Sequence, residues 1–179
     1  MRVAVIDSGI TPCAETGPVA GGISFVDETW TDRLGHGTWV AATIRQYAPE
    51  ADLFAVKIFG RRLETTMETL LRAMRWAERE GMDIANLSLG TREALPEIGG
   101  MLVVTPDGLQ EEPAAPITGL QAPSGVSFAV ARRTGRLAAA WRLGIDREEW
   151  RKSLEAARFS VARSVLPLRS RQNRPALPK

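Results

Sequence analysis

The chain of 179 residues contains a single histidine, His36, which lies in the stretch Gly-His-Gly-Thr at residues 35–38. Histidine has the ordinary pKa nearest to neutrality, so it is the usual general base. A lone histidine is more often a surface or helix-capping residue. Two other stretches change that interpretation. Asp7 lies upstream in an Asp-Ser-Gly turn, and Ser127 lies downstream in Gly-Val-Ser-Phe-Ala.

An aspartate, a histidine and a serine together can perform nucleophilic acyl transfer. The hydroxyl attacks a carbonyl carbon, the imidazole takes up and returns its proton, and the carboxylate fixes the imidazole tautomer. A serine in the first turn of a helix gains further, because its backbone N–H and the helix dipole stabilise the developing oxyanion. These residue types therefore predict a triad of Asp7, His36 and Ser127.

Each member of this triad also has a structural interpretation. Asp7 can be a turn residue, and Ser127 can be a helix cap, with Ser124 as a second candidate for that cap. Cys13 paired with His36 is a weaker alternative for the nucleophile, because no cysteine-peptidase signature surrounds it. We favour the triad because three such stretches occur together with the only histidine.

The elements that would position these residues alternate between strands and helices. We expect strands at residues 2–6, 23–26, 53–58, 83–89 and 101–104, and helices at 36–46, 64–80 and 127–143. This alternation predicts a three-layer α/β fold, a mostly parallel sheet with helices on both faces. In open sheets of this kind, functional groups gather at the carboxyl ends of the strands.

The remainder of the chain supports a single domain. Residues 1–165 are expected to form it, ending in a helix at 146–162 for which Asp146 is the N-cap and Glu149 completes a capping box. Residues 166–179 are rich in proline and arginine and hold no acidic residue, so we expect a poorly ordered basic tail.

Composition excludes several functional classes. The formal net charge of +2 is too small to indicate a nucleic-acid partner, and the single cysteine, Cys13, excludes an intrachain disulfide. No stretch approaches the ~18 uninterrupted apolar residues of a membrane span. No cluster of histidine, cysteine and carboxylate side chains suggests a metal, so no cofactor is expected. The N-terminus enters a strand without a signal-peptide pattern, which predicts a cytoplasmic protein.

The three stretches resemble, in the same order, the Asp, His and Ser motifs of subtilisin-like serine peptidases (subtilases). The matching segments are residues 3–9, 35–41 and 125–129. Residues 48–57 and 81–90 are similar to two further strands of that family, and the resemblance covers about residues 1–142. It implies a reduced subtilisin-like fold in which Ser127 is the nucleophile, His36 the general acid and base, and Asp7 the residue that orients His36.

The resemblance also implies a substrate site. Ser88, Leu89 and Gly90 match the edge that pairs with the substrate backbone in this family. The chain is shorter than a usual subtilase domain, and Ala131 and Arg132 stand where the family has a proline followed by a histidine.

The asparagine that donates to the oxyanion in this family is missing. Residues 101–108 can be aligned in two ways. In the first, Asp107 replaces that asparagine. In the second, which we prefer, Thr105 and Pro106 match the turn before the catalytic serine. The second alignment implies that a block between Gly90 and Met101, including the asparagine and one wall of the pocket for the substrate side chain, is deleted.

The expected function is therefore a serine endopeptidase that selectively processes a peptide or a partner protein. A homodimer or a partner protein would complete the missing wall. The alternative is a catalytically weak or inactive module that binds a peptide or protein. Neither nucleic acid nor membrane is an expected partner.

Overall fold

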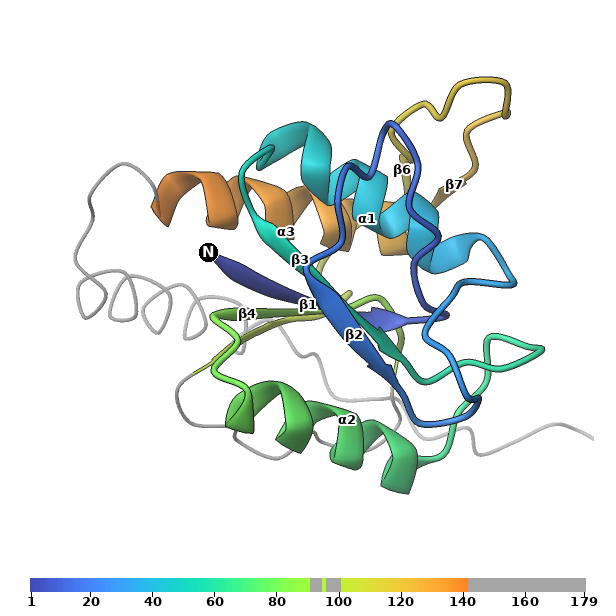
Figure 1. The fold of residues 1–179 in the computed structure, drawn as a ribbon. Coiled ribbons are helices and arrows are strands. Elements are labelled where there is room, and N and C mark those ends of the chain that lie inside the picture. Colours follow the sequence, from blue (N-terminus) through green and yellow to red (C-terminus); the bar gives the residue numbers. More distant parts are fainter. Residues whose placement is uncertain (91–94, 96–100, 142–179) are drawn as a thin grey trace, which may run out of the picture. The chain divides into compact units, whose positions relative to one another are not determined.

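The computed structural model describes residues 1–90, 95 and 101–141 (Figure 1). The chain divides into one compact unit, Met1–Ile145, and a second unit, Asp146–Lys179. The helix expected at 146–162 and the tail expected at 166–179 lie outside the described residues. Within the described part of the chain, no helix is long and apolar enough to cross a membrane.

Five parallel strands form the central sheet in the order β2-β3-β1-β4-β5. They are β1 (Arg2–Asp7), β2 (Gly21–Ser24), β3 (Asp52–Lys57), β4 (Ile84–Leu87) and β5 (Leu102–Val104). Because β1 is the middle strand, its last residues lie between the carboxyl ends of two neighbours. Asp7 pairs in register with Lys57 of β3, and Ile6 pairs with Leu87 of β4.

Helices cover both faces of this sheet (Figure 1). The helices α1 (His36–Tyr47) and α3 (Val126–Trp141) lie on one face, and α2 (Met67–Arg79) lies on the other. The expected three-layer α/β fold is therefore confirmed. The helices α1 and α3 approach closely at Gly135, where an added Cβ would lie 2.8 Å from the carbonyl oxygen of Ile44.

The strand β1 is buried on both faces, as a strand between two helical layers must be. Ala4 and Ile6 pack into the core between the sheet and α2, together with Leu70 and Met74 of that helix. Since side chains alternate along a strand, Val3 and Val5, which are also fully buried, face the layer of α1 and α3. The same alternation places Asn86 of β4 on the α3 side, because Ala85 and Leu87 belong to the α2 core.

Several elements begin at positions other than those expected. The strand β2 begins at Gly21 rather than at residue 23. The helix α2 begins at Met67 rather than at residue 64, because the hydroxyl of Thr66 accepts the Thr69 N–H at 3.1 Å and so forms the N-cap.

A short hairpin was not expected in the segment before α3. The strands β6 (Glu112–Pro113) and β7 (Ser124–Gly125) pair antiparallel, and β7 leads directly into α3 at Val126. Ser127 is therefore the second residue of its helix, and the interpretation of Ser127 as the N-cap is wrong. Ser124, the other candidate for the cap, belongs to β7.

Candidate active site

Asp7 and His36 form the centre of the site. Asp7 ends the middle strand and is fully buried. Its Oδ1 lies 2.7 Å from His36 Nδ1 and also accepts the Ser8 N–H at 2.7 Å. Because a carboxylate accepts hydrogen bonds, this pairing keeps the proton on Nδ1 and leaves Nε2 of His36 for another partner.

The approach of His36 to Asp7 depends on a glycine in the first turn of α1. A Cβ on Gly37 would lie 2.2 Å from the carbonyl oxygen of Gly9 and 3.2 Å from Asp7 Cβ. The N–H of Gly37 donates to the buried hydroxyl of Ser8 at 2.9 Å. Only glycine therefore lets the helix start directly against the Asp-Ser-Gly turn.

Asp32 caps α1 from outside the helix. Its Oδ1 accepts the N–H groups of Leu34 and Gly35, each at 2.9 Å. Its Oδ2 accepts the N–H of Thr38 at 2.9 Å and the hydroxyl of Thr38 at 2.7 Å. Asp32 lies between the strand expected at 23–26 and the helix expected at 36–46, and its role as a cap was not predicted. The available signal was an aspartate a few residues before a helix whose own cap position is a glycine.

A buried lysine supports the segment that carries Asp32. Lys57 ends β3, is fully buried, and forms an ion pair with Asp27 at 2.7 Å. Its Nζ also donates to the carbonyl oxygen of Thr31 at 2.8 Å. The hydrogen bond from Lys57 lowers the pKa of Asp27, against an opposing effect of burial. The loop before α1 is thereby attached to the carboxyl end of the sheet.

The electrostatic environment favours a charged His36. Burial of the ring is the largest single influence on its pKa and lowers it. The hydrogen bond to Asp7, the charge of Asp7 and the charge of Asp32 act in the opposite direction and together prevail. The pKa of His36 is therefore raised above its ordinary value, which suits a base that must hold a proton during a reaction.

Ser127 lies in the first turn of α3. Its hydroxyl donates to the carbonyl oxygen of Ser88 at 3.2 Å, and the hydroxyl of Ser88 donates to the carbonyl oxygen of Ser127 at 3.4 Å. The ring of the next residue, Phe128, lies 5.8 Å from the ring of His36, centroid to centroid. Hydrogen bonds thus join Asp7 to His36 and Ser127 to Ser88, and Phe128, the neighbour of Ser127 in the chain, lies near the ring of His36.

Of the other residues predicted for the site, those after β4 lie at the carboxyl edge of the sheet, whereas Asp107 and Cys13 belong to other segments. Ser88, Leu89 and Gly90 follow the carboxyl end of β4, and Leu89 packs partly against the α2 core. Asp107 is exposed and accepts the hydroxyl of Thr105 at 2.8 Å, so it acts there as an acceptor and not as an oxyanion donor. Cys13 lies in the loop before β2, where its N–H donates to Thr16.

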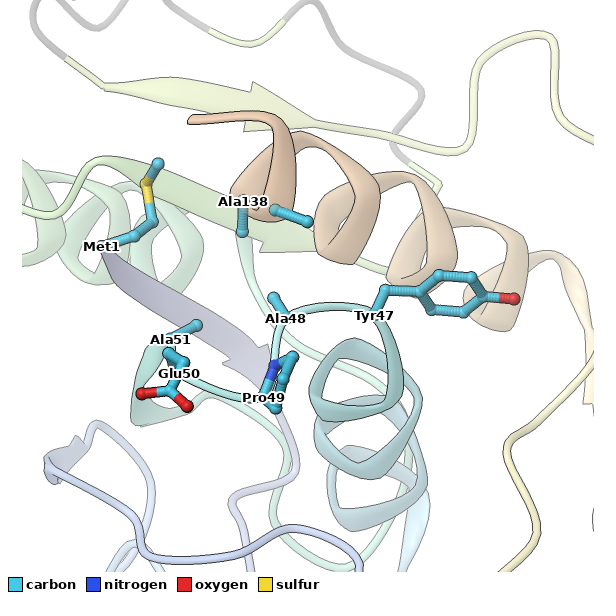
Figure 2. A pocket seen from close by; sticks show the side chains of 8 residues that line it. Met1, Tyr47, Ala48, Pro49, Glu50, Ala51 and Ala138 are labelled. Atoms are coloured by element: carbon cyan, nitrogen blue, oxygen red, sulfur yellow. The ribbon is translucent and has the colours of Figure 1, made fainter. Parts of the chain in front are cut away.

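A cavity of about 330 Å³ lies elsewhere (Figure 2). Met1, Tyr47 and Ala138 line it, so it lies near the start of β1, whereas Asp7 is at the other end of that strand. Among the described residues, no three histidine, cysteine or carboxylate side chains gather to hold a metal ion. The cavity and the candidate site at the carboxyl edge of the sheet are therefore separate.

Comparisons of the sequence with known proteins all indicate the same protein family. The sequence model of the subtilase family matches residues 1–137. Subtilisin Savinase from Lederbergia lenta is 37% identical over 102 residues, which cover 51% of this chain and 38% of that protein. Alkaline elastase YaB from Bacillus sp. (strain YaB) is 38% identical over 102 residues, covering 51% of this chain and 27% of that protein.

A solved structure resembles the fold over a longer stretch. The crystal structure of a cold adapted subtilisin-like serine proteinase superposes with a TM-score of 0.69, at 19% identity, over 87% of this chain and 81% of that chain. The sequence alignments, in contrast, span well under half of the two relatives, 38% and 27% of their lengths.

Proposed function

Because the chain belongs to the subtilase family, we propose that it is a serine endopeptidase with Ser127 as nucleophile, His36 as general acid and base, and Asp7 as the orienting carboxylate. The observation that carries this proposal is the 2.7 Å hydrogen bond between buried Asp7 and His36 Nδ1. A buried carboxylate fixed on an imidazole nitrogen is the pairing that directs the other nitrogen toward a hydroxyl.

In the proposed reaction, the hydroxyl of Ser127 turns from the carbonyl of Ser88 to Nε2 of His36. Its oxygen attacks the scissile carbonyl carbon while His36 takes the proton, and Asp7 stabilises the imidazolium. His36 then gives that proton to the leaving amine as the C–N bond breaks. A water molecule then attacks the resulting ester and loses a proton to His36. His36 returns this proton to Oγ of Ser127 as the ester C–O bond breaks, which releases the acid and restores the free hydroxyl.

The proposed oxyanion site consists of the start of α3. The first N–H groups of a helix have no partner within the helix, so the N–H of Ser127 is directed at an incoming oxygen, aided by the helix dipole. The proposed substrate is an extended peptide or protein segment. Its backbone would pair with Ser88, Leu89 and Gly90 beyond the end of β4.

A fluorophosphonate probe tests this proposal, because it reacts covalently with an activated serine. We expect the wild-type protein to be labelled at Ser127, the Ser127→Ala variant to remain unlabelled, and Ser124→Ala to be labelled like wild type. Ser124 is a suitable control because it lies two residues before the start of α3, in β7. A folded wild-type protein that takes up no label would contradict the proposal.

One observation favours a second candidate, a module that binds a peptide without cutting it. The hydroxyl of Ser127 donates its hydrogen to the carbonyl oxygen of Ser88 in this structure. For such a module, a peptide would remain intact during incubation and bind equally well to wild type and to His36→Ala. Cleavage of that peptide by wild type, lost in His36→Ala, would exclude the binding module and support the peptidase.

A further inference from the structure

A chain of hydrogen bonds runs from the interior of the fold to Ser127. The hydroxyl of Thr134 in α3 donates to Oδ1 of Asn86 in β4 at 2.9 Å. Nδ2 of Asn86 donates to Oγ of Ser88 at 2.7 Å, and that Oγ donates to the carbonyl oxygen of Ser127 at 3.4 Å. The chain therefore connects a side chain on the third turn of α3 with the backbone of the first turn.

The direction of this chain follows from its last member. A carbonyl oxygen only accepts, so the hydroxyl of Ser88 must donate to Ser127. Ser88 Oγ then accepts from the amide NH₂ of Asn86, which turns the amide oxygen toward Thr134. Since an amide oxygen also only accepts, Thr134 must be the donor. Every hydrogen in the chain thus points toward Ser127.

Burial makes this direction costly to change. Asn86 and Thr134 are both fully buried. A buried amide must find partners for its oxygen and its NH₂ group, because leaving either group unpaired carries the full cost of desolvation. Thr134 is the hydroxyl that satisfies the amide oxygen of Asn86 and so fixes which way the amide faces.

Ser88 acts on Ser127 at two points. Its hydroxyl holds the Ser127 carbonyl, and its own carbonyl accepts the Ser127 hydroxyl at 3.2 Å. We infer that Thr134 and Asn86 are positioning residues, which orient the hydroxyl of Ser88 and through it hold the backbone of Ser127, from which the Ser127 side chain turns to His36. This inference rests on the proposed function, because it assigns the two residues to the serine that the peptidase would use.

The inference predicts what happens when the first donor is removed. In Thr134→Val, Oδ1 of Asn86 has lost its donor, so the amide is free to rotate and present its oxygen to Ser88. The hydroxyl of Ser88 then donates to Asn86 and releases the carbonyl of Ser127. Thr134→Ser keeps the donor and should keep the arrangement.

The test is the saturation kinetics of fluorophosphonate labelling. For Thr134→Val we expect the maximal rate of labelling to fall about tenfold while the concentration for half-saturation stays unchanged, because positioning and not probe binding is impaired. Thr134→Ser should label at close to the wild-type rate. Adding Thr134→Val to the Ser88→Ala variant should not lower the rate of labelling further, because Ser88→Ala has already broken the connection to Ser127.

Thr43→Val is the matched control for loss of a buried helical hydroxyl. Thr43 is fully buried in α1, donates to Trp39 O at 2.8 Å and accepts the Ala115 N–H at 3.0 Å. The Thr43→Val variant should lose about as much stability as Thr134→Val. Its labelling by the probe should proceed at the wild-type rate. If Thr134→Val labels like wild type, or if Thr43→Val slows labelling equally, the inference is wrong.

A protein that takes up no label would refute the proposed function, and the hydrogen-bond chain is then tested by NMR. Thr134→Val should shift both the Asn86 side-chain amide and the Ser127 backbone amide resonances, while Thr43→Val leaves them in place. Unchanged Asn86 and Ser127 resonances in Thr134→Val would overturn the inference without any reference to activity.

Discussion

Asp7 binds His36 with one carboxylate oxygen only. Oδ1 lies 2.7 Å from His36 Nδ1, whereas Oδ2 is buried and has no hydrogen-bond partner among the described residues. A buried carboxylate with an unpaired oxygen interacts strongly with a neighbouring cation, because little else compensates its charge. The negative charge of Asp7 is therefore available chiefly to His36, and this relationship governs the first prediction.

The rate of fluorophosphonate labelling should rise with pH and reach half its maximum above pH 6.5, the ordinary pKa of histidine. In the proposed mechanism His36 must be neutral to take up the Ser127 proton, and the raised pKa of His36 moves its deprotonation to higher pH. Asp32→Asn should lower the midpoint, because the charge of Asp32 contributes to the upward shift. Glu68→Gln, on α2 across the sheet, should leave it unchanged.

The same shift affects stability in a defined direction. A folded-state pKa above the unfolded value means that protonated His36 stabilises the fold fully below pH 6.5, the unfolded value, and that this contribution disappears as pH rises through the folded pKa. Urea unfolding of wild type and His36→Gln at several pH values measures it. A difference between the two proteins that does not shrink with rising pH would contradict the assignment.

Asp32→Ala should destabilise the protein by about 2 kcal/mol, more than the ~1 kcal/mol typical of a lost N-cap, because Asp32 accepts four hydrogen bonds at the start of α1. Thr66→Ala removes the ordinary cap of α2 and should cost about 1 kcal/mol. Urea unfolding compares the two. Only Asp32→Ala should also change the NMR titration of His36, and an equal effect of both variants on that titration would argue against the predicted link.

Gly37→Ala should lower both stability and labelling. The added methyl group meets the backbone of Gly9 at 2.2 Å, so the start of α1 must move away from Asp7. We expect the free energy of unfolding to fall by about 1–3 kcal/mol, the usual range for overpacking. The distance between Asp7 and His36 should increase. Gly60→Ala is the control, because nothing lies within 4 Å of its added Cβ. Similar unfolding curves for the two variants would be inconsistent with this close contact.

The NMR titration of the Thr118 amide should show that the pKa of Glu15 is unusually low. The N–H of Thr118 donates to Glu15 Oε1 at 2.8 Å, and hydrogen bonding with Thr118 lowers the pKa of Glu15 to about 2. The resonance of this amide should titrate near pH 2 and not near pH 4.5. The contact therefore contributes its stability above the unfolded pKa and loses it as pH falls toward 2.

Glu15→Gln provides the control for that titration. It should abolish the low-pH transition of the Thr118 amide, while the nearby Leu120 amide, which donates to Ile117 O at 3.0 Å, shows no such transition in either protein. A Thr118 midpoint near pH 4.5 would mean that Glu15 does not hold this turn in solution.

The fold class and the family could be predicted from local patterns. Short apolar runs such as residues 2–6 are typical of strands covered on both faces, and the helix α1 follows from its apolar spacing. The sequence also predicts that Asp7 and His36 lie close together, and their side chains are 2.7 Å apart. Their catalytic roles, and that of Ser127, remain predictions that the labelling experiment tests.

Long-range polar contacts could not be predicted in the same way. Asp32 caps a helix that begins four residues later, and Asn86 meets Thr134 only because β4 and α3 pack face to face. Neither pairing leaves a periodic signal, since each depends on where the backbone places two distant side chains. The hairpin of β6 and β7 was missed for a related reason, because strands of two residues have no alternation to read.

The proposed site can be assembled only when α1 and α3 have come into close contact at Gly135. This requirement sets how late in protein synthesis the site can form. Asp7 and His36 leave the ribosome early, within the first quarter of the chain, but Ser127 follows only after every strand of the central sheet has been made. A contact between such distant segments forms late, because the intervening chain must first be ordered. A nascent chain therefore holds Asp7 and His36 well before it holds Ser127, and the proposed triad can be assembled only after α3 docks on α1.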